Sequence, residues 1–228
     1  MSSFSHNDLW LVRQLESAMR TALVRAYERV RVHPDEYLMQ LRMTHGVAAV
    51  SYEGLFSIPV AELDSIAWQT VRGAMKLAGA EGAGLGVGGI ATILPDVGIL
   101  SAITMRMLQK LSLIYGFQYN TDEEVAELWI AAATAAGVDV SKELLERTLI
   151  RQFVQRVVGR IARQTSAELG EKIMVRAVPL VSSAVGAVMN YYFVRAWGRR
   201  ALAHFRQRHM EERRRRQPIL LGPGENPV

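Results

Sequence analysis

The sequence predicts an all-α protein, a single helical, bundle-like domain with a glycine-rich central helical hairpin. Three observations favour this fold class. Apolar residues recur at spacings of three and four along most of the chain, as they do on the buried face of a helix. Capping residues and glycines separate these periodic segments. The chain has 228 residues, half of them hydrophobic, so it can bury a sizeable core.

The first half begins with a long amphipathic helix. Apolar residues over 9–30 recur at helical spacing, and Pro34 marks the end of that helix. A short helix over 35–45 and a loop over 47–59 follow. Because proline is favoured in the first turn of a helix, we expect the next helix to begin near Pro59 and to run to about residue 78.

A glycine-rich run occupies residues 79–89, of which six are glycine. Asp96 then stands where an N-cap belongs, before a helix over 97–115. Gly116 follows that helix and suits its C-terminal turn. The run and its two flanking helices form the predicted central hairpin.

The second half begins with a capping box, in which Thr121 caps a helix and Glu124 reaches back to it. That helix is expected to end at Gly137. Three more helices are expected over 141–169, 171–194 and 196–215, and the tail over 217–228 is expected to be disordered. We divide the chain into an amphipathic N-terminal arm (1–43), a helical domain (44–210) and a basic tail (211–228).

Two stretches lack charge, Gly82–Pro95 with its extension to Met105, and Ala177–Val194. Small residues that allow close backbone approach lie within them: Gly82, Gly86, Gly89, Ser182 and Gly186. We expect the two stretches to pack against each other. The sequence allows three placements of these stretches: buried in the core, in shallow contact with a bilayer, or spanning it. Insertion of Asp96 into the centre of a bilayer would cost about 3 kcal/mol, which disfavours a span.

Four polar residues lie in or beside these apolar stretches: Glu81, Asp96, Arg106 and Asn190. They are candidates for a ligand pocket or for structural polar contacts. Asp96 is explained most simply as an N-cap, and Arg106 is a candidate ion-pair partner for Glu81.

Other motifs argue against several classes of chemistry. The chain has no cysteine, which excludes disulfides and thiolate chemistry. The glycines over 84–89 match GxGxxG, but a helical segment precedes them where a nucleotide site needs a strand. The histidines lack metal-binding spacing. We therefore expect no metal and no cofactor, and the residues assign no catalytic group.

Charge is unevenly distributed. Residues 1–141 hold 10 Lys and Arg against 15 Asp and Glu, whereas residues 142–216 hold 17 against 6. Basic excess of this kind favours an anionic partner. The residues expected to bind an anionic surface are Arg195, Arg199, Arg200, Arg213, Arg214, Arg215 and Arg216. Trp197 and Phe205 lie among them, and Tyr191, Tyr192 and Phe193 lie just before them, as interfacial aromatics. Arg156, Arg160 and Arg163 add to the basic half.

The chain resembles the EcsC family over roughly residues 44–210. The residues that carry the resemblance are His45-Gly46, Tyr52-Glu53, Ile58-Pro59 with Leu63-Asp64, the run Gly82–Gly89, Asp96, Arg106, Tyr115-Gly116, Val178–Val181, Gly186 and Asn190-Tyr191. The family takes its name from a protein encoded beside an ABC transporter. The resemblance implies a bacterial helical protein with a membrane link and supplies no catalytic residues.

These observations favour a non-enzymatic, peripheral membrane-associated accessory or interaction protein, linked to a transporter or envelope process. No signal sequence is visible at the start. We therefore expect a cytoplasmic location at the inner face of the membrane, with an anionic lipid surface or a membrane protein as partner. Self-association is left open. The alternatives are a small-molecule binder or hydrolase-like enzyme with a pocket near the hairpin, and nucleic-acid binding through the arginine-rich half.

Overall fold

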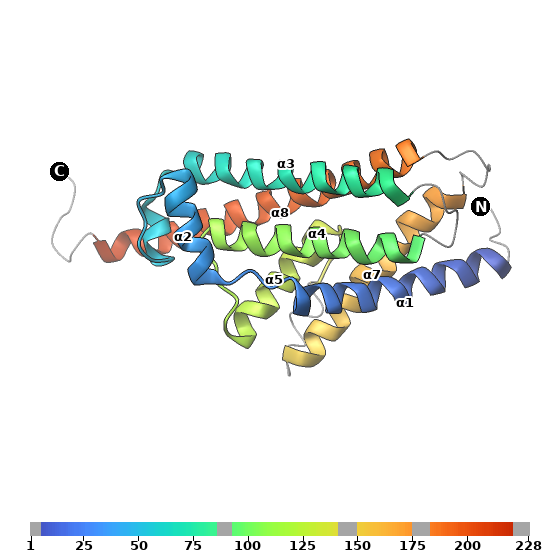
Figure 1. Cartoon of the computed structure of the whole chain (residues 1–228). Coiled ribbons are helices and arrows are strands. Elements are labelled where there is room, and N and C mark those ends of the chain that lie inside the picture. Colours follow the sequence, from blue (N-terminus) through green and yellow to red (C-terminus); the bar gives the residue numbers. More distant parts are fainter. Residues whose placement is uncertain (1–5, 86–92, 141–149, 175–182, 221–228) are drawn as a thin grey trace.

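The structure is a computed structural model that describes residues 6–85, 93–140, 150–174 and 183–220 (Figure 1). These residues form helices and connecting turns, with no strand among them, which confirms the predicted all-α fold. In order, the helices are α1 (His6–Arg29), α2 (Pro34–His45), the 3-10 helix η1 (Glu53–Ser57), α3 (Val60–Leu85), α4 (Ile93–Ile114), α5 (Asp122–Ala135), α7 (Ile150–Met174) and α8 (Ser183–Leu220).

Helix α4 forms the centre of the bundle and contacts α1, α3, α5 and α8. Its side chains are buried around most of its circumference, including Met105, Leu108 and Leu111. The segment Val97–Ile114 is the one helical stretch of the described residues that is long and apolar enough to cross a membrane, with mean hydropathy 1.3, and 72% of it is buried inside the protein. The apolar side chains of α4 therefore form part of the protein's core.

Helices α3 and α8 pack side by side in opposite directions (Figure 1). Gly79, near the end of α3, faces Ala187 near the start of α8, and Val71 faces Gly198. A Cβ at Gly198 would lie 2.6 Å from Val71 Cγ1, so only glycine permits this backbone approach. The pair is the most extensive helix contact of the fold.

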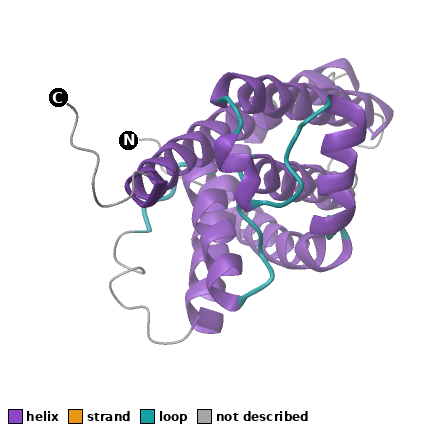
Figure 2. Cartoon of the chain, turned by 90° about the vertical axis from the view of Figure 1, so that its left-hand side faces the viewer, coloured by secondary structure: helices purple, strands orange, loops and turns teal. Residues whose placement is uncertain are grey.

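Helices α1 and α7 pack together on another side of α4, and α5 contacts both α7 and α8. Figure 2, viewed from the end that carries α2, shows the described helices packed side by side. The predicted α1 is confirmed, and its residues Leu15, Met19 and Leu23 lie in the core.

The connection from α1 to α2 is fixed by hydrogen bonds to the core. The Val32 N–H donates to Gln109 Oε1 at 2.8 Å, and the Tyr119 hydroxyl donates to the Val32 carbonyl. The Tyr52 hydroxyl donates to the Pro34 carbonyl at 2.6 Å. Because both backbone groups of Val32 are satisfied inside the protein, the start of α2 is held at a defined place.

Two predicted helix ends are confirmed in detail. Gly116 ends α4 with φ +88°, and the Phe56 ring would lie 2.9 Å from a Cβ there, so the turn requires glycine. Thr121 caps α5 through its hydroxyl, which accepts from the Glu124 N–H, while the Glu124 carboxylate accepts from the Thr121 N–H.

The predicted boundaries of the hairpin helices were wrong. Helix α3 does not end near residue 78 but continues through three glycines to Leu85, and α4 begins at Ile93. Asp96 therefore lies inside the first turn of α4 and is not its N-cap. Pro95 is tolerated there because an N–H in the first turn has no intrahelical partner. A Cβ at Gly79 would lie 3.8 Å from Ala187 and Tyr191, an ordinary van der Waals distance, so the packing against α8 does not require glycine there.

The rear of the chain also differs from the prediction. Helix α7 continues past residue 169 to Met174, and α8 is one unbroken helix where a break near residue 195 was expected. Val194, Trp197 and Ala201 form a continuous buried seam on α8, which explains the missing break. The expected loop over 47–59 contains the short helix η1.

Several predictions fall on residues whose surroundings the structure does not describe. Gly86, Gly89 and Ser182 lie outside the described residues, and for Gly82 and Gly186 only the helical backbone is described. Close packing at these five positions stays a prediction, as do the three domain boundaries. Since a Cβ at Gly79 would lie 3.8 Å from the Ala187 carbonyl oxygen, the flank of the first uncharged stretch lies beside the second stretch.

We predict that Gly198→Leu lowers the free energy of unfolding by about 2–3 kcal/mol, because the added side chain must displace Val71 from the core. Gly73→Leu is the matched control, since a Cβ at Gly73 would meet no atom within 4 Å. Urea unfolding followed by far-UV circular dichroism measures both. Equal stabilities of the two variants would contradict the assigned α3–α8 contact.

Candidate functional site

Three groups of polar side chains on this bundle are candidates for function. The first joins α3, α4 and α8. The Tyr115 hydroxyl donates to Asp64 Oδ1 at 2.7 Å, and Arg206 Nε donates to Asp64 Oδ2 at 2.8 Å. Burial and the hydrogen bond to Asp64 raise the pKa of Tyr115. Both carboxylate oxygens of Asp64 are thus engaged, and this group ties the three helices together.

His209 completes this network from α8. The ring is fully buried, its Nδ1–H donates to the Tyr115 carbonyl at 2.9 Å, and it stacks on Phe56 with ring centroids 4.8 Å apart. A carbonyl only accepts, so the proton is on Nδ1. Burial lowers the pKa of His209, assisted by the charges of Arg213 and Arg216. The histidine is therefore neutral at neutral pH, and it packs the end of α8 onto η1.

The second group lines a pocket of about 360 Å³ between α5 and α8. Its acids and bases are nearly balanced, and Arg208 Nη2 lies 3.7 Å from Glu127 Oε2. The lining residues are Phe117, Glu127, His204, Gln207, Arg208, Glu211, Glu212 and Arg215. Burial lowers the pKa of His204. Such a self-neutralised pocket has no preference for a strongly charged ligand. Across the described residues, no three His, Asp or Glu side chains are grouped to hold a metal ion.

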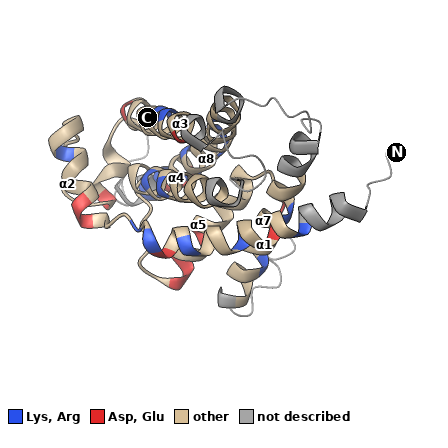
Figure 3. Ribbon diagram, turned by 45° about the vertical axis from the view of Figure 1, so that its right-hand side comes forward, with Lys and Arg blue, Asp and Glu red and all other residues tan. Residues whose placement is uncertain are grey.

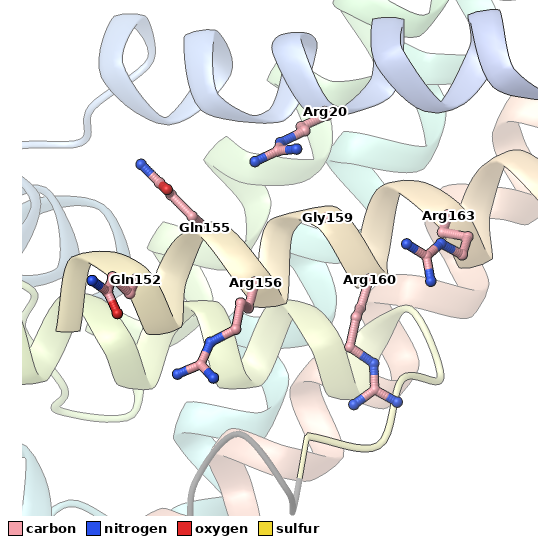
Figure 4. Close-up of a pocket in the computed structure, with 7 residues that line it drawn as sticks. All are labelled: Arg20, Gln152, Gln155, Arg156, Gly159, Arg160 and Arg163. Carbon is pink, nitrogen blue, oxygen red and sulfur yellow. The ribbon is translucent and has the colours of Figure 1, made fainter. Parts of the chain in front are cut away.

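The third group is a groove between α1 and α7 with a volume of about 540 Å³ (Figure 4). It is lined by Arg20, Gln152, Gln155, Arg156, Gly159, Arg160 and Arg163. Four of these seven residues are arginines and none is acidic. Arg20 reaches from α1 toward α7, whereas the other three arginines project from α7. We call it the arginine groove.

A fourth feature lies at the end of the molecule formed by α2, η1 and the last turns of α8 (Figure 1). Met39, Met43 and Val50 are 60%, 82% and 76% exposed there. Arg213 Nη1 donates to the Ile58 carbonyl at 3.3 Å, and Arg216 lies over the Phe56 ring at 4.1 Å. These contacts place Arg213–Arg216 beside η1. We call Met39, Met43 and Val50 with Arg213–Arg216 the basic–apolar end.

The four polar residues predicted as a pocket are not gathered around either groove. Glu81 near the end of α3 and Asp96 at the start of α4 lie at the same end of the bundle, because residues 86–92 join the two helices. Asn190 is buried on α8. Arg106 lies about 15 Å along α4 from Asp96, is exposed, and makes no ion pair with Glu81 among the described contacts.

The arginines predicted to bind an anionic surface divide into two sets. Arg200 donates to the Ala135 carbonyl at 3.0 Å and so satisfies the end of α5, while Arg213 and Arg216 contact Ile58, Glu212 and Phe56. Arg199, Arg214 and Arg215 are exposed, and Arg195 is partly exposed. In Figure 3, where Lys and Arg positions are coloured blue on the ribbon, these positions occur on several helices.

The expectation that Trp197 and Phe205 serve as interfacial aromatics was wrong. Both are buried in the core, because they lie on the seam of α8 that faces the bundle. Two of the other aromatics predicted for this role, Tyr191 and Tyr192, are exposed. The sequence reasoning also missed Arg20 and the exposed Met39, Met43 and Val50. Met39 and Met43 are four residues apart, so they lie on the same face of a helix. This spacing was the signal in the sequence that could have identified them.

The sequence profile of the EcsC protein family matches residues 12–210. The chain is also similar to Protein EcsC of Bacillus subtilis (strain 168), with 27% identity over 159 residues, which cover 68% of this chain and 67% of the relative. No solved structure matches the chain. Asp64, Tyr115 and Gly116, which carry part of the family resemblance, converge in the network that joins α3, α4 and α8.

We predict a loss of stability on acidification that depends on His209. The folded protein holds the pKa of His209 below its unfolded value of about 6.5, so the unfolded state binds the proton first. The stabilisation is present above pH 6.5 and is lost as the pH falls below it. Urea unfolding between pH 7.5 and 5.5 should show a shallower pH dependence for His209→Gln than for the wild type, whatever their absolute stabilities. Parallel profiles would show that the histidine is not buried as a neutral ring.

Proposed function

The chain belongs to the EcsC protein family, and we propose that it is a non-enzymatic accessory protein that docks peripherally on an anionic membrane surface at the cytoplasmic face. The observation that carries this proposal is the basic–apolar end, where exposed apolar side chains and a run of four arginines occur together. A transporter or another envelope component is the proposed client of the docked protein.

The apolar part of this end supports contact with lipid. Met39 and Met43 are one helical turn apart on the outer face of α2, and Val50 is in the neighbouring connection. Full burial of one such side chain is worth roughly 1.5–3 kcal/mol. Methionine is flexible and suits an irregular, fluid surface. Three exposed residues of this size are enough for a shallow insertion and too few for a span.

The charged part selects the kind of lipid. Each arginine near an anionic surface contributes about 1 kcal/mol. Glu212 forms an ion pair with Arg216 at 2.8 Å and so reduces the attraction of Arg216 to an anionic surface. Arg214 and Arg215 are exposed. Charge and apolar contact together give a reversible attachment, and two weak signals of this kind are the usual requirement for peripheral binding.

The enzyme and nucleic-acid alternatives receive less support. Asp64, Tyr115 and His209 form a network whose groups are bound to one another. The arginines of the rear half are spread over several faces and partly used in capping and packing. The combination of arginines with exposed methionines fits a lipid surface better than a nucleic acid, which has no apolar layer for Met43 to enter.

We predict that the full chain floats with vesicles that contain anionic lipid and not with neutral vesicles, and that added salt weakens the binding. Arg214→Glu with Arg215→Glu should weaken binding at least about thirtyfold, since about 2 kcal/mol of attraction is lost. The matched control is Arg195→Glu with Arg199→Glu, the same charge change about 26 Å away on α8. Equal losses in both double variants would contradict docking through this end.

We predict a second effect from the apolar side chains. Met39→Ser with Met43→Ser should weaken binding to anionic vesicles about tenfold and leave the folded structure unchanged, because both side chains are exposed. Leu77→Ser, at another exposed apolar position on α3, serves as the control and should bind like the wild type. Vesicle sedimentation with circular dichroism measures binding and folding. Undiminished binding of the methionine variant would remove the apolar part of the proposal.

A further inference from the structure

We infer that the arginine groove is a binding site for an anion that carries two or more closely spaced phosphate groups. The site is separate from the basic–apolar end, since it is built from α1 and α7, and the inference does not depend on membrane docking. Nothing in the family assignment describes such a site.

The charge of the groove is the first support. Arg20, Arg156, Arg160 and Arg163 bring four positive charges to one groove whose lining has no acid. Glu16 lies at its edge, with Oε1 3.5 Å from Arg163 Nε, but the Arg163 side chain is 75% exposed and remains accessible. Arg156 and Arg160 also take part in interactions within the protein, which help to hold them in place. Like charges so close together favour a multiply charged anion as ligand.

The spacing of the arginines indicates the kind of anion. Arg156, Arg160 and Arg163 follow one another by four and three residues, so they lie on one face of α7 and span about 10 Å along its axis. A guanidinium binds a phosphate through two parallel N–H donors. A single phosphate is too small to meet the whole row, whereas two or more linked phosphates can contact successive arginines. Gln152 and Gln155 add neutral donors at one end of the groove.

The shape of the groove is the second support. Its volume of about 540 Å³ lies in the usual range for small-ligand sites. Gly159 lies in the middle of the lining, and a Cβ there would meet no atom within 4 Å. Packing therefore does not require a glycine at this position, although glycine costs roughly 0.5–1 kcal/mol in a helix. Its absent side chain leaves open space within the lining of the groove.

The open space at Gly159 gives a sharp test. Gly159→Glu places a carboxylate in the groove, and its Cβ would meet no atom within 4 Å. Gly73→Glu is the matched control, because Gly73 is also a helical glycine with open space around its Cβ position and the variant has the same net charge. Isothermal titration calorimetry with pyrophosphate, orthophosphate and sulfate, at constant ionic strength, measures binding to the full chain.

We expect pyrophosphate to bind at least tenfold more tightly than orthophosphate or sulfate. Gly159→Glu should weaken pyrophosphate binding at least tenfold, and Gly73→Glu should bind like the wild type. If Gly159→Glu does not fold by circular dichroism, Arg160→Gln takes its place with the same expectation. Equal binding of all three anions, or equal effects of the two glutamate variants, would overturn the inference.

Two further arms identify the source of the phosphates. Competition by soluble inositol phosphates, together with loss of binding to vesicles containing phosphoinositides in Gly159→Glu alone, would assign the groove to a lipid headgroup. Binding of pyrophosphate without any such vesicle effect would assign it to a soluble phosphate compound. Tighter binding of a DNA duplex than of pyrophosphate through Arg156 and Arg160 would overturn the inference in favour of a nucleic-acid backbone.

Discussion

The packing of α8 against α3 and α4 is the constraint on which the rest of the molecule depends. At Gly198 the backbone of α8 comes close enough to Val71 and Met107 that no side chain fits between them. This contact fixes the register of α8, which in turn sets Arg206 beside Asp64 and His209 beneath Phe56. Because α8 is a single straight element, its last turns then carry the arginine run to the end of the molecule formed by α2 and η1.

The arginines of this protein serve two physical purposes. Some are structural, since Arg200 satisfies a carbonyl at the end of α5, Arg206 pairs with Asp64, and Arg216 lies over Phe56. Others are displayed on the surface, among them Arg214 and Arg215, and the four of the arginine groove. The basic excess of the rear half is therefore shared between holding helices together and presenting positive charge at two separate places.

Much of the fold could be predicted from the sequence because its signals are local. The capping box at Thr121 and the C-terminal glycine at Gly116 fix helix ends by hydrogen bonds between neighbours in the chain. The missed continuity of α8 depends on contacts between distant segments. Val194, Trp197 and Ala201 are buried against other helices, and no local rule contains those contacts.

The sites were harder to predict for the same reason. Arg156, Arg160 and Arg163 were visible as a basic stretch, but Arg20 joins them only because α1 packs on α7. Trp197 and Arg214 belong to one helix, and its packing alone decides that the first is buried and the second exposed.

The most direct test of the account is the position of the basic–apolar end relative to lipid. Since the chain has no cysteine, a single cysteine at position 43 or 50 can carry an environment-sensitive fluorophore, with position 77 as the reference. The account predicts a blue-shifted emission and quenching by nitroxide-labelled lipids at 43 and 50 when anionic vesicles are added, and neither at 77. Unchanged emission at 43 and 50 while the protein is vesicle-bound would contradict it.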